Sequence, residues 1–158
     1  MEQLPLWHEV LVELRRIIRA TDLQSRRVVK ACGLTIPQVM VLRAIADLGD
    51  VTVRRLADHV SLSQATVTTI LNRLESRDLV IRVRSASDKR VVNARLTDAG
   101  RDILASAPTL LHEKFIERFN GLAEGDQSSI LAAIRSVAEM MDAEKIDASP
   151  LLDVNQPG

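Results

Sequence analysis

At 158 residues, of which 46% are apolar but only 2% aromatic, the chain is expected to form one mainly helical domain with an aliphatic core, and not two large independent domains. The formal net charge is zero, but residues 15–95 carry 16 Lys and Arg against 7 Asp and Glu, so this region can meet an anionic partner such as DNA. The lack of an apolar run of about 18 residues excludes a membrane span, and the lone Cys32 and an N-terminus unlike a secretory signal predict a cytoplasmic location.

Two helices are expected at the start of the chain. Apolar residues spaced three and four apart after Pro5 predict a long first helix over residues 6–30, which Gly33 ends. Pro37 opens a second, shorter helix that stops before Gly49.

A helix, a tight turn and another helix follow. Residues 53–60 predict the third helix, with Thr52 as its cap, and Ser63 ends the turn and caps a fourth helix over residues 64–77. The fourth helix is amphipathic, with an apolar face of Val67, Ile70, Leu71 and Leu74 and a polar face of Gln64, Thr68, Asn72 and Arg73.

The pattern then alternates, which is typical of a β-hairpin. The first strand, over residues 79–84, points Leu79, Ile81 and Val83 one way and Val80, Arg82 and Arg84 the other. Residues 92–96 return as the second strand, and the polar tip between them carries Lys89 and Arg90 outward.

From Asp98 the pattern is helical again, and two closing helices are expected, with a kink at Pro108 in the first of them. Residues 147–158 predict an irregular tail. The fold class is therefore mainly α, with α+β character from the hairpin. A winged helix-turn-helix spans residues 34–97. The helices of residues 6–32 and 98–143 form a dimerisation region, because they carry more apolar surface than one small winged module can bury.

The fourth helix and the hairpin have the residue types that read duplex DNA. A helix-turn-helix lets its second helix enter a major groove, where Gln64 and Asn72 can pair with adenine edges and Arg73 can hold a phosphate or a guanine. An ordinary solvated helix face is the alternative for these polar residues, but the basic hairpin beside them argues against it, since a narrow minor groove attracts arginine. The predicted DNA-contacting residues are Ser61, Ser63, Gln64, Ala65, Thr66, Thr68, Thr69, Asn72, Arg73, Arg84, Ser87, Asp88, Lys89 and Arg90.

Three segments in this order resemble the MarR family of bacterial transcriptional regulators. They are residues 34–42 (LTIPQVMVL), residues 85–90 (SASDKR) and residues 96–100 (LTDAG), within a similarity that covers residues 6–141. The hairpin pattern, with an aspartate two residues before an arginine and a Leu-Thr-x-x-Gly exit, is the most specific part.

The resemblance implies a homodimer, usually a repressor, with an effector cleft between its dimerisation and DNA-binding regions. Arg90 would enter the minor groove, held by a charge-assisted hydrogen bond from Asp88, and the alternative for Asp88 is a plain turn residue. The residues expected to line the effector cleft are Arg15, Arg19 and Arg43. Two-fold symmetry further predicts a pseudo-palindromic operator.

Other functions have weaker support. The chain lacks a phosphate-binding glycine loop, a nucleophile elbow and clustered histidines, so an enzyme is not expected, nor is a cofactor or a metal site at His8, His59 or His112. A protein-interaction adaptor on a winged-helix scaffold stays open as the main alternative. A redox-sensing regulator that acts through Cys32 stays open as a second.

Overall fold

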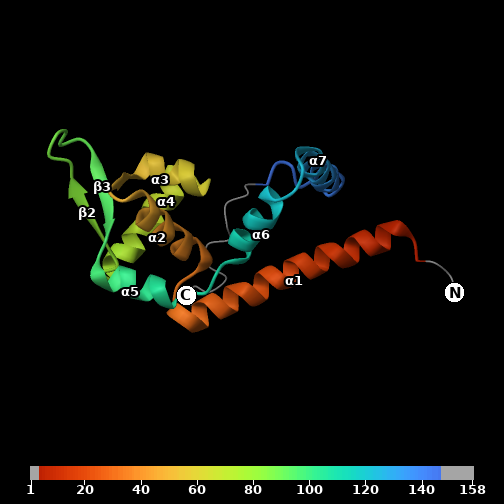
Figure 1. The fold of residues 1–158 in the computed structure, drawn as a ribbon, viewed down its shortest axis with the longest axis horizontal. Coiled ribbons are helices and arrows are strands. Elements are labelled where there is room, and N and C mark those ends of the chain that lie inside the picture. Colours follow the sequence, from red (N-terminus) through yellow and green to blue (C-terminus); the bar gives the residue numbers. More distant parts are fainter. Residues whose placement is uncertain (1–3, 147–158) are drawn as a thin grey trace. The chain divides into compact units, whose positions relative to one another are not determined.

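The computed structural model describes residues 4–146, which are mainly helical with a small antiparallel sheet of three strands (Figure 1). Two compact units, divided after Pro108, are each described by themselves. The first contains α1 (Leu6–Cys32), α2 (Ile36–Leu48), β1 (Val51–Thr52), α3 (Val53–Val60), α4 (Gln64–Ser76), β2 (Val80–Arg84), β3 (Val92–Leu96) and α5 (Asp98–Ser106). The second contains α6 (Leu111–Asn120) and α7 (Glu124–Met140).

The helix-turn-helix of α3 and α4 forms where the sequence predicts it. The Thr52 hydroxyl accepts the backbone N–H of Arg55 at 3.2 Å, and the Ser63 hydroxyl accepts that of Thr66 at 3.1 Å. Each contact satisfies a backbone donor that the first turn of a helix leaves without a partner. Between the helices Ser61 adopts a left-handed conformation with φ of +56°, which reverses the chain within three residues.

An aliphatic core holds these helices together. The apolar face expected of α4 is buried, and it packs with buried residues of α2 and α3 such as Leu42 and Leu56. Among the described residues, the buried apolar side chains are aliphatic apart from Cys32, as the composition predicts. Trp7 and Phe115 are instead largely exposed.

The sheet has one strand more than the sequence analysis predicts. β1 pairs with β3 through Val51 and Ala94, and the strand order is β1-β3-β2. In β2, Val80 is buried opposite Leu96, whereas Ile81 is 43% exposed. Because cross-strand partners share a face, the inward face of β2 is the one that carries Val80 and Arg82.

The expected kink at Pro108 is wrong, because the helix ends there. α5 stops at Ser106, and Ala107 is extended with φ of −72° and ψ of 134°, the conformation favoured before a proline. Three closing helices result instead of two. Arg43 of α2 donates to the carbonyl of Pro108 at 2.9 Å, which supplies a partner where the helical ladder stops.

The Leu-Thr-x-x-Gly segment ties the hairpin to α5. The Thr97 hydroxyl donates to the carbonyl of Asp78 at 2.6 Å and accepts the backbone N–H of Gly100 at 2.9 Å. A Cβ on Gly100 would lie only 2.1 Å from the carbonyl oxygen of Leu79. The glycine therefore allows α5 to begin directly against the start of β2.

The first and last helices bury little within the chain. α1 ends at Gly33 as expected, but it buries only Gln24, Val28 and Cys32 near that end, and its expected apolar stripe is exposed. α6 and α7 have no buried residue. None of the described helices is by itself long and apolar enough to cross a membrane, and only α1 and α2 together, with a 65° bend between them, pass such a test. The predicted tail at residues 147–158 lies outside the described residues.

Candidate nucleic-acid interface

The outward face of α4 presents polar side chains along its whole length. Gln64, Ala65, Thr69 and Asn72 are exposed, and Thr66, Thr68 and Arg73 are half-buried. Two threonine hydroxyls already have hydrogen-bond partners within the protein. The Thr66 hydroxyl lies 2.8 Å from that of Ser63, and the Thr69 hydroxyl donates to the carbonyl of Ala65. The structure thus brings the predicted residues of α4 and its preceding turn onto one surface.

The tip of the hairpin is held by backbone contacts and is fully solvent-facing. Ser87, Asp88, Lys89 and Arg90 are all exposed. The Asp88 carboxylate accepts the backbone N–H of Arg90 at 2.9 Å, an aspartate turn, and no ion pair with the Arg90 guanidinium occurs in this part of the described chain. In this geometry Asp88 shapes the tip, and the arginine side chain is left to extend into solvent.

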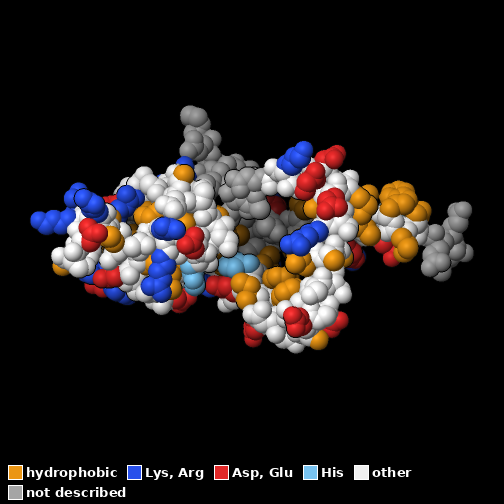
Figure 2. Space-filling view, turned by 90° about the horizontal axis from the view of Figure 1, so that it is seen from above, with side chains coloured by type: hydrophobic (Ala, Val, Ile, Leu, Met, Phe, Trp, Pro, Cys, Tyr) orange, Lys and Arg blue, Asp and Glu red, His pale blue; other side chains and the backbone are white. Residues whose placement is uncertain are grey.

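Basic side chains gather around the hairpin and α3. Figure 2 shows Lys and Arg side chains concentrated on the left, the side where Figure 1 draws the hairpin. Arg84 is exposed in β2, and so are Arg54 and Arg55 on α3, which are not among the predicted DNA-contacting residues. The first helix of a helix-turn-helix crosses the DNA backbone, and that rule could have identified the two α3 arginines.

Asn72 makes a contact that its predicted role did not include. Its side-chain carbonyl accepts a hydrogen bond from the Arg82 guanidinium of β2, and Arg82 also lies 3.2 Å from the Glu75 carboxylate. The hairpin and α4 are therefore joined through side chains as well as through the chain.

The three arginines proposed for an effector cleft do not meet. Arg15 and Arg19 line a shallow groove along α1, whereas Arg43 of α2 donates a hydrogen bond to the carbonyl of Pro108. Nothing in the geometry of the described residues makes them one site.

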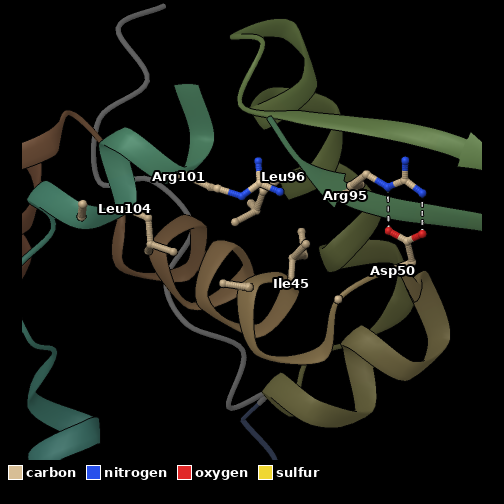
Figure 3. Close-up of a pocket in the computed structure, with 9 residues that line it drawn as sticks. Ile45, Asp50, Arg95, Leu96, Arg101 and Leu104 are labelled. Atoms are coloured by element: carbon tan, nitrogen blue, oxygen red, sulfur yellow. Dashed lines mark hydrogen bonds and ion pairs between the residues drawn. The ribbon is translucent and has the colours of Figure 1, made fainter. Parts of the chain in front are cut away.

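A separate pocket of about 530 Å³ lies between the end of α2, β3 and α5 (Figure 3). Its walls are apolar at Ile45, Leu96 and Leu104, and Arg101 of α5 reaches its edge. Its volume is within the range of small-molecule sites.

An ion pair borders this pocket. Arg95 Nε donates to Asp50 Oδ1 at 2.6 Å, and Arg95 Nη2 donates to Asp50 Oδ2. The hydrogen bond from Arg95 lowers the pKa of Asp50 below its ordinary value, and the same bond raises the pKa of Arg95. Because both side chains are well exposed, the ion pair fixes their orientation and adds little to the free energy of unfolding.

Cys32 does not have the surroundings of a reactive thiol. It is buried, and its Sγ donates to the carbonyl of Val28 at 3.2 Å. Reactive cysteines are accessible thiolates near positive charge, so this environment does not favour redox sensing. Within residues 4–146, no group of three or more His, Cys, Asp and Glu side chains could hold a metal ion.

Comparison with known proteins identifies relatives of this arrangement. The family model described as "MarR family" matches residues 34–92, from the start of α2 to the hairpin. The chain is 29% identical over 126 residues to the HTH-type transcriptional regulator YsmB of Bacillus subtilis, a match that covers 78% of this chain and 86% of YsmB. It is 38% identical over 79 residues to the regulator MgrA of Staphylococcus aureus, which is 50% of this chain and 54% of MgrA.

A solved structure extends the similarity over most of the chain. The PcaV transcriptional regulator of Streptomyces coelicolor, in complex with its natural ligand, superposes with a TM-score of 0.59 at 26% identity. The match covers 89% of this chain and 99% of PcaV.

Proposed function

Because the chain belongs to the MarR family of winged helix-turn-helix transcriptional regulators, which are not enzymes, we propose that it is a repressor that binds a pseudo-palindromic operator as a homodimer. In this proposal α4 enters the major groove and the hairpin reaches the adjoining minor groove. The observation that carries it is the capped α3–α4 pair, whose exposed polar face lies beside an exposed basic hairpin.

The outward residues fit the two grooves differently. The amide and hydroxyl groups of α4 suit base edges, whereas Arg84, Lys89 and Arg90 suit phosphates and the electronegative minor groove. Arg54 and Arg55 extend the basic surface along α3, where they would meet the DNA backbone.

A homodimer is supported by the apolar surface that the chain leaves exposed. Large apolar side chains stand out along α1, α6 and α7, and those on α1 include Ile17 and Ile18, which are 57% and 68% exposed. Removing one such side chain from water contributes about 1.5–3 kcal/mol, so covering many of them with a second copy gives a strong driving force. Two copies related by a two-fold axis then present two reading helices to one operator.

A small effector is part of the proposal. The pocket between α2, β3 and α5 adjoins the base of the hairpin, so a molecule bound there could change the position of the hairpin relative to α5. Its apolar walls and Arg101 suit a compact molecule with an anionic group. Leu104→Trp fills the pocket. Small carboxylates that raise the melting temperature of the parent protein should therefore not raise that of this variant.

DNA binding is tested by fluorescence anisotropy with duplexes selected from a random pool. For the parent protein, the logarithm of the binding constant should fall steeply and linearly with the logarithm of salt concentration, because several phosphates are neutralised. Arg90→Ala should weaken binding while leaving the dimer intact, and Arg135→Ala on α7 should not. A protein-interaction adaptor would show no such salt dependence, and binding of operator by Arg90→Ala as tight as by the parent would contradict the hairpin assignment.

Dimerisation is tested by light scattering after size-exclusion chromatography. Ile18→Glu places a charge in the proposed dimer surface and should yield monomers at concentrations where the parent is dimeric. Ile81→Glu makes the same change at an exposed isoleucine of the hairpin and should leave the dimer unchanged. Equal masses for the two variants and the parent would exclude α1 from the dimer surface.

A further inference from the structure

One guanidinium joins the hairpin to two residues of α4. Arg82 Nη2 donates to Asn72 Oδ1, and Arg82 Nε lies 3.2 Å from Glu75 Oε2. Asn72 and Glu75 are three residues apart and therefore neighbours on the surface of the helix. Arg82 can thus contact both at once from the adjacent strand.

Arg82 is held in place by its surroundings. Its side chain is 27% exposed, and it lies on the inward face of β2, opposite Ala94 of β3. Its Nε is inaccessible to water and finds no hydrogen-bond acceptor among the described residues, so at this atom Glu75 acts through its charge. A partly buried cation without a nearby carboxylate would be costly, and the position of Glu75 therefore keeps the guanidinium beside α4.

The guanidinium determines which way the Asn72 amide points. A guanidinium only donates hydrogen bonds, and within an asparagine side chain only Oδ1 accepts them. Oδ1 of Asn72 must therefore face Arg82, and the Nδ2 group is directed away from it. Asn72 is exposed, so its two Nδ2–H donors face a partner molecule, whereas Oδ1 is turned toward Arg82.

This orientation changes what Asn72 can read in a major groove. An asparagine that recognises adenine uses both ends of its amide, accepting from N6 and donating to N7. Guanine presents only acceptors at N7 and O6 on its edge of the groove, and thymine presents an acceptor at O4. Resting on the proposed placement of α4 in the groove, we propose that Arg82 is a positioning residue that turns the Nδ2–H donors of Asn72 toward the base edge. Asn72 then favours guanine, which accepts at both N7 and O6, over adenine, which accepts at N7 but donates at N6.

The proposal is tested by selecting bound sequences from random duplexes. The parent protein and Asn72→Ala together identify the base position whose preference depends on Asn72. In the parent that position should favour guanine over adenine. Arg82→Met keeps the apolar stem of the side chain but frees the amide, and the ratio of adenine to guanine there should rise about tenfold.

Two further variants separate positioning from folding. Arg84→Met makes the same change two residues along β2 at an exposed site, and it should weaken binding without altering the preferred base at that position. Asn72→Asp keeps an acceptor toward Arg82 and replaces the outward donor by an acceptor. The preference should then move to cytosine or adenine, which present donors at N4 and N6. This variant decides the question even if Arg82→Met does not fold.

The failing outcomes are distinct from failure of DNA binding itself. If the parent selects no sequence, the proposed function is wrong and the inference falls with it. If the parent selects a two-fold site, the proposed DNA binding as a dimer stands. The inference is then overturned by adenine at the Asn72-dependent position, by the absence of such a position, or by an unchanged preference in both Arg82→Met and Asn72→Asp.

Discussion

Replacing Gly100 by alanine tests the contact between α5 and the start of the hairpin. The new Cβ would lie 2.1 Å from the Leu79 oxygen and 3.1 Å from the Leu79 carbon, whereas ordinary contacts are 3.4–4 Å. Both atoms belong to the backbone, and the oxygen also accepts the Thr97 N–H at 3.2 Å, so no side-chain rotation can relieve the overlap. α5 and the Leu79 backbone would have to move apart by more than about 1 Å. Overpacking of this degree lowers the free energy of unfolding by about 1–3 kcal/mol.

Alanine also has an advantage over glycine inside a helix, of about 0.5–1 kcal/mol. The two effects leave a net destabilisation of about 0–2.5 kcal/mol, and its centre of about 1.2 kcal/mol lowers the urea midpoint by about 0.6 M if the m-value is near 2 kcal/mol/M. Far-ultraviolet circular dichroism at one fixed protein concentration measures it, since the stability of the proposed dimer would depend on concentration. Gly125→Ala, where a Cβ meets nothing within 4 Å, is the matched control. A midpoint for Gly100→Ala at or above that of the parent would refute the close approach of α5 to Leu79.

Three other substitutions test local contacts by the same urea measurement. Ser63→Ala removes the cap of α4 and should cost about 0.5–2 kcal/mol, and an unchanged midpoint would show that the cap does not stabilise the helix. Thr97→Val leaves the Asp78 carbonyl and the Gly100 N–H without their partner and should cost about 1–3 kcal/mol, whereas Thr97→Ser should restore most of it. Asp50→Asn should lower stability slightly at neutral pH. Because the pKa of Asp50 is lowered in the folded state, that difference should be present above about pH 4 and disappear as the pH falls further, and a difference that persists in acid would contradict the ion pair.

Local signals explain most of what the sequence predicts correctly. The starts of α3 and α4 follow from Thr52 and Ser63, because a cap acts on backbone donors only two or three residues away. The buried face of α4 follows from helical periodicity in the same way.

The differences arise where distant segments decide the outcome. β1 is two residues long and exists only because Val51 meets Ala94, a pairing that no local pattern encodes. The exposure of Ile81 depends on which side of β2 faces Leu96 and the helices. At Pro108 the missing N–H could have produced either a kink or an end, and the side chain of Arg43 stabilises the end.

The candidate interface shows the same division. Residue types and order predict the exposed polar face of α4 and the exposed basic hairpin, which the structure has, but not how their side chains contact one another. The hydrogen bond from Arg82 to Asn72 joins residues ten apart on different elements, and a prediction of base contacts from Asn72 alone could not include it.

The position of Trp7 gives the molecule a built-in optical reporter. It is the only tryptophan, the chain has no tyrosine, and Trp7 lies on the first turn of α1 with 64% of its surface exposed. Its indole emission therefore depends on the polarity around the start of α1 and should change little when the aliphatic core unfolds. Spectral shifts and quencher accessibility at successive dilutions can follow the proposed subunit assembly without an attached dye, while ellipticity records loss of the helices independently.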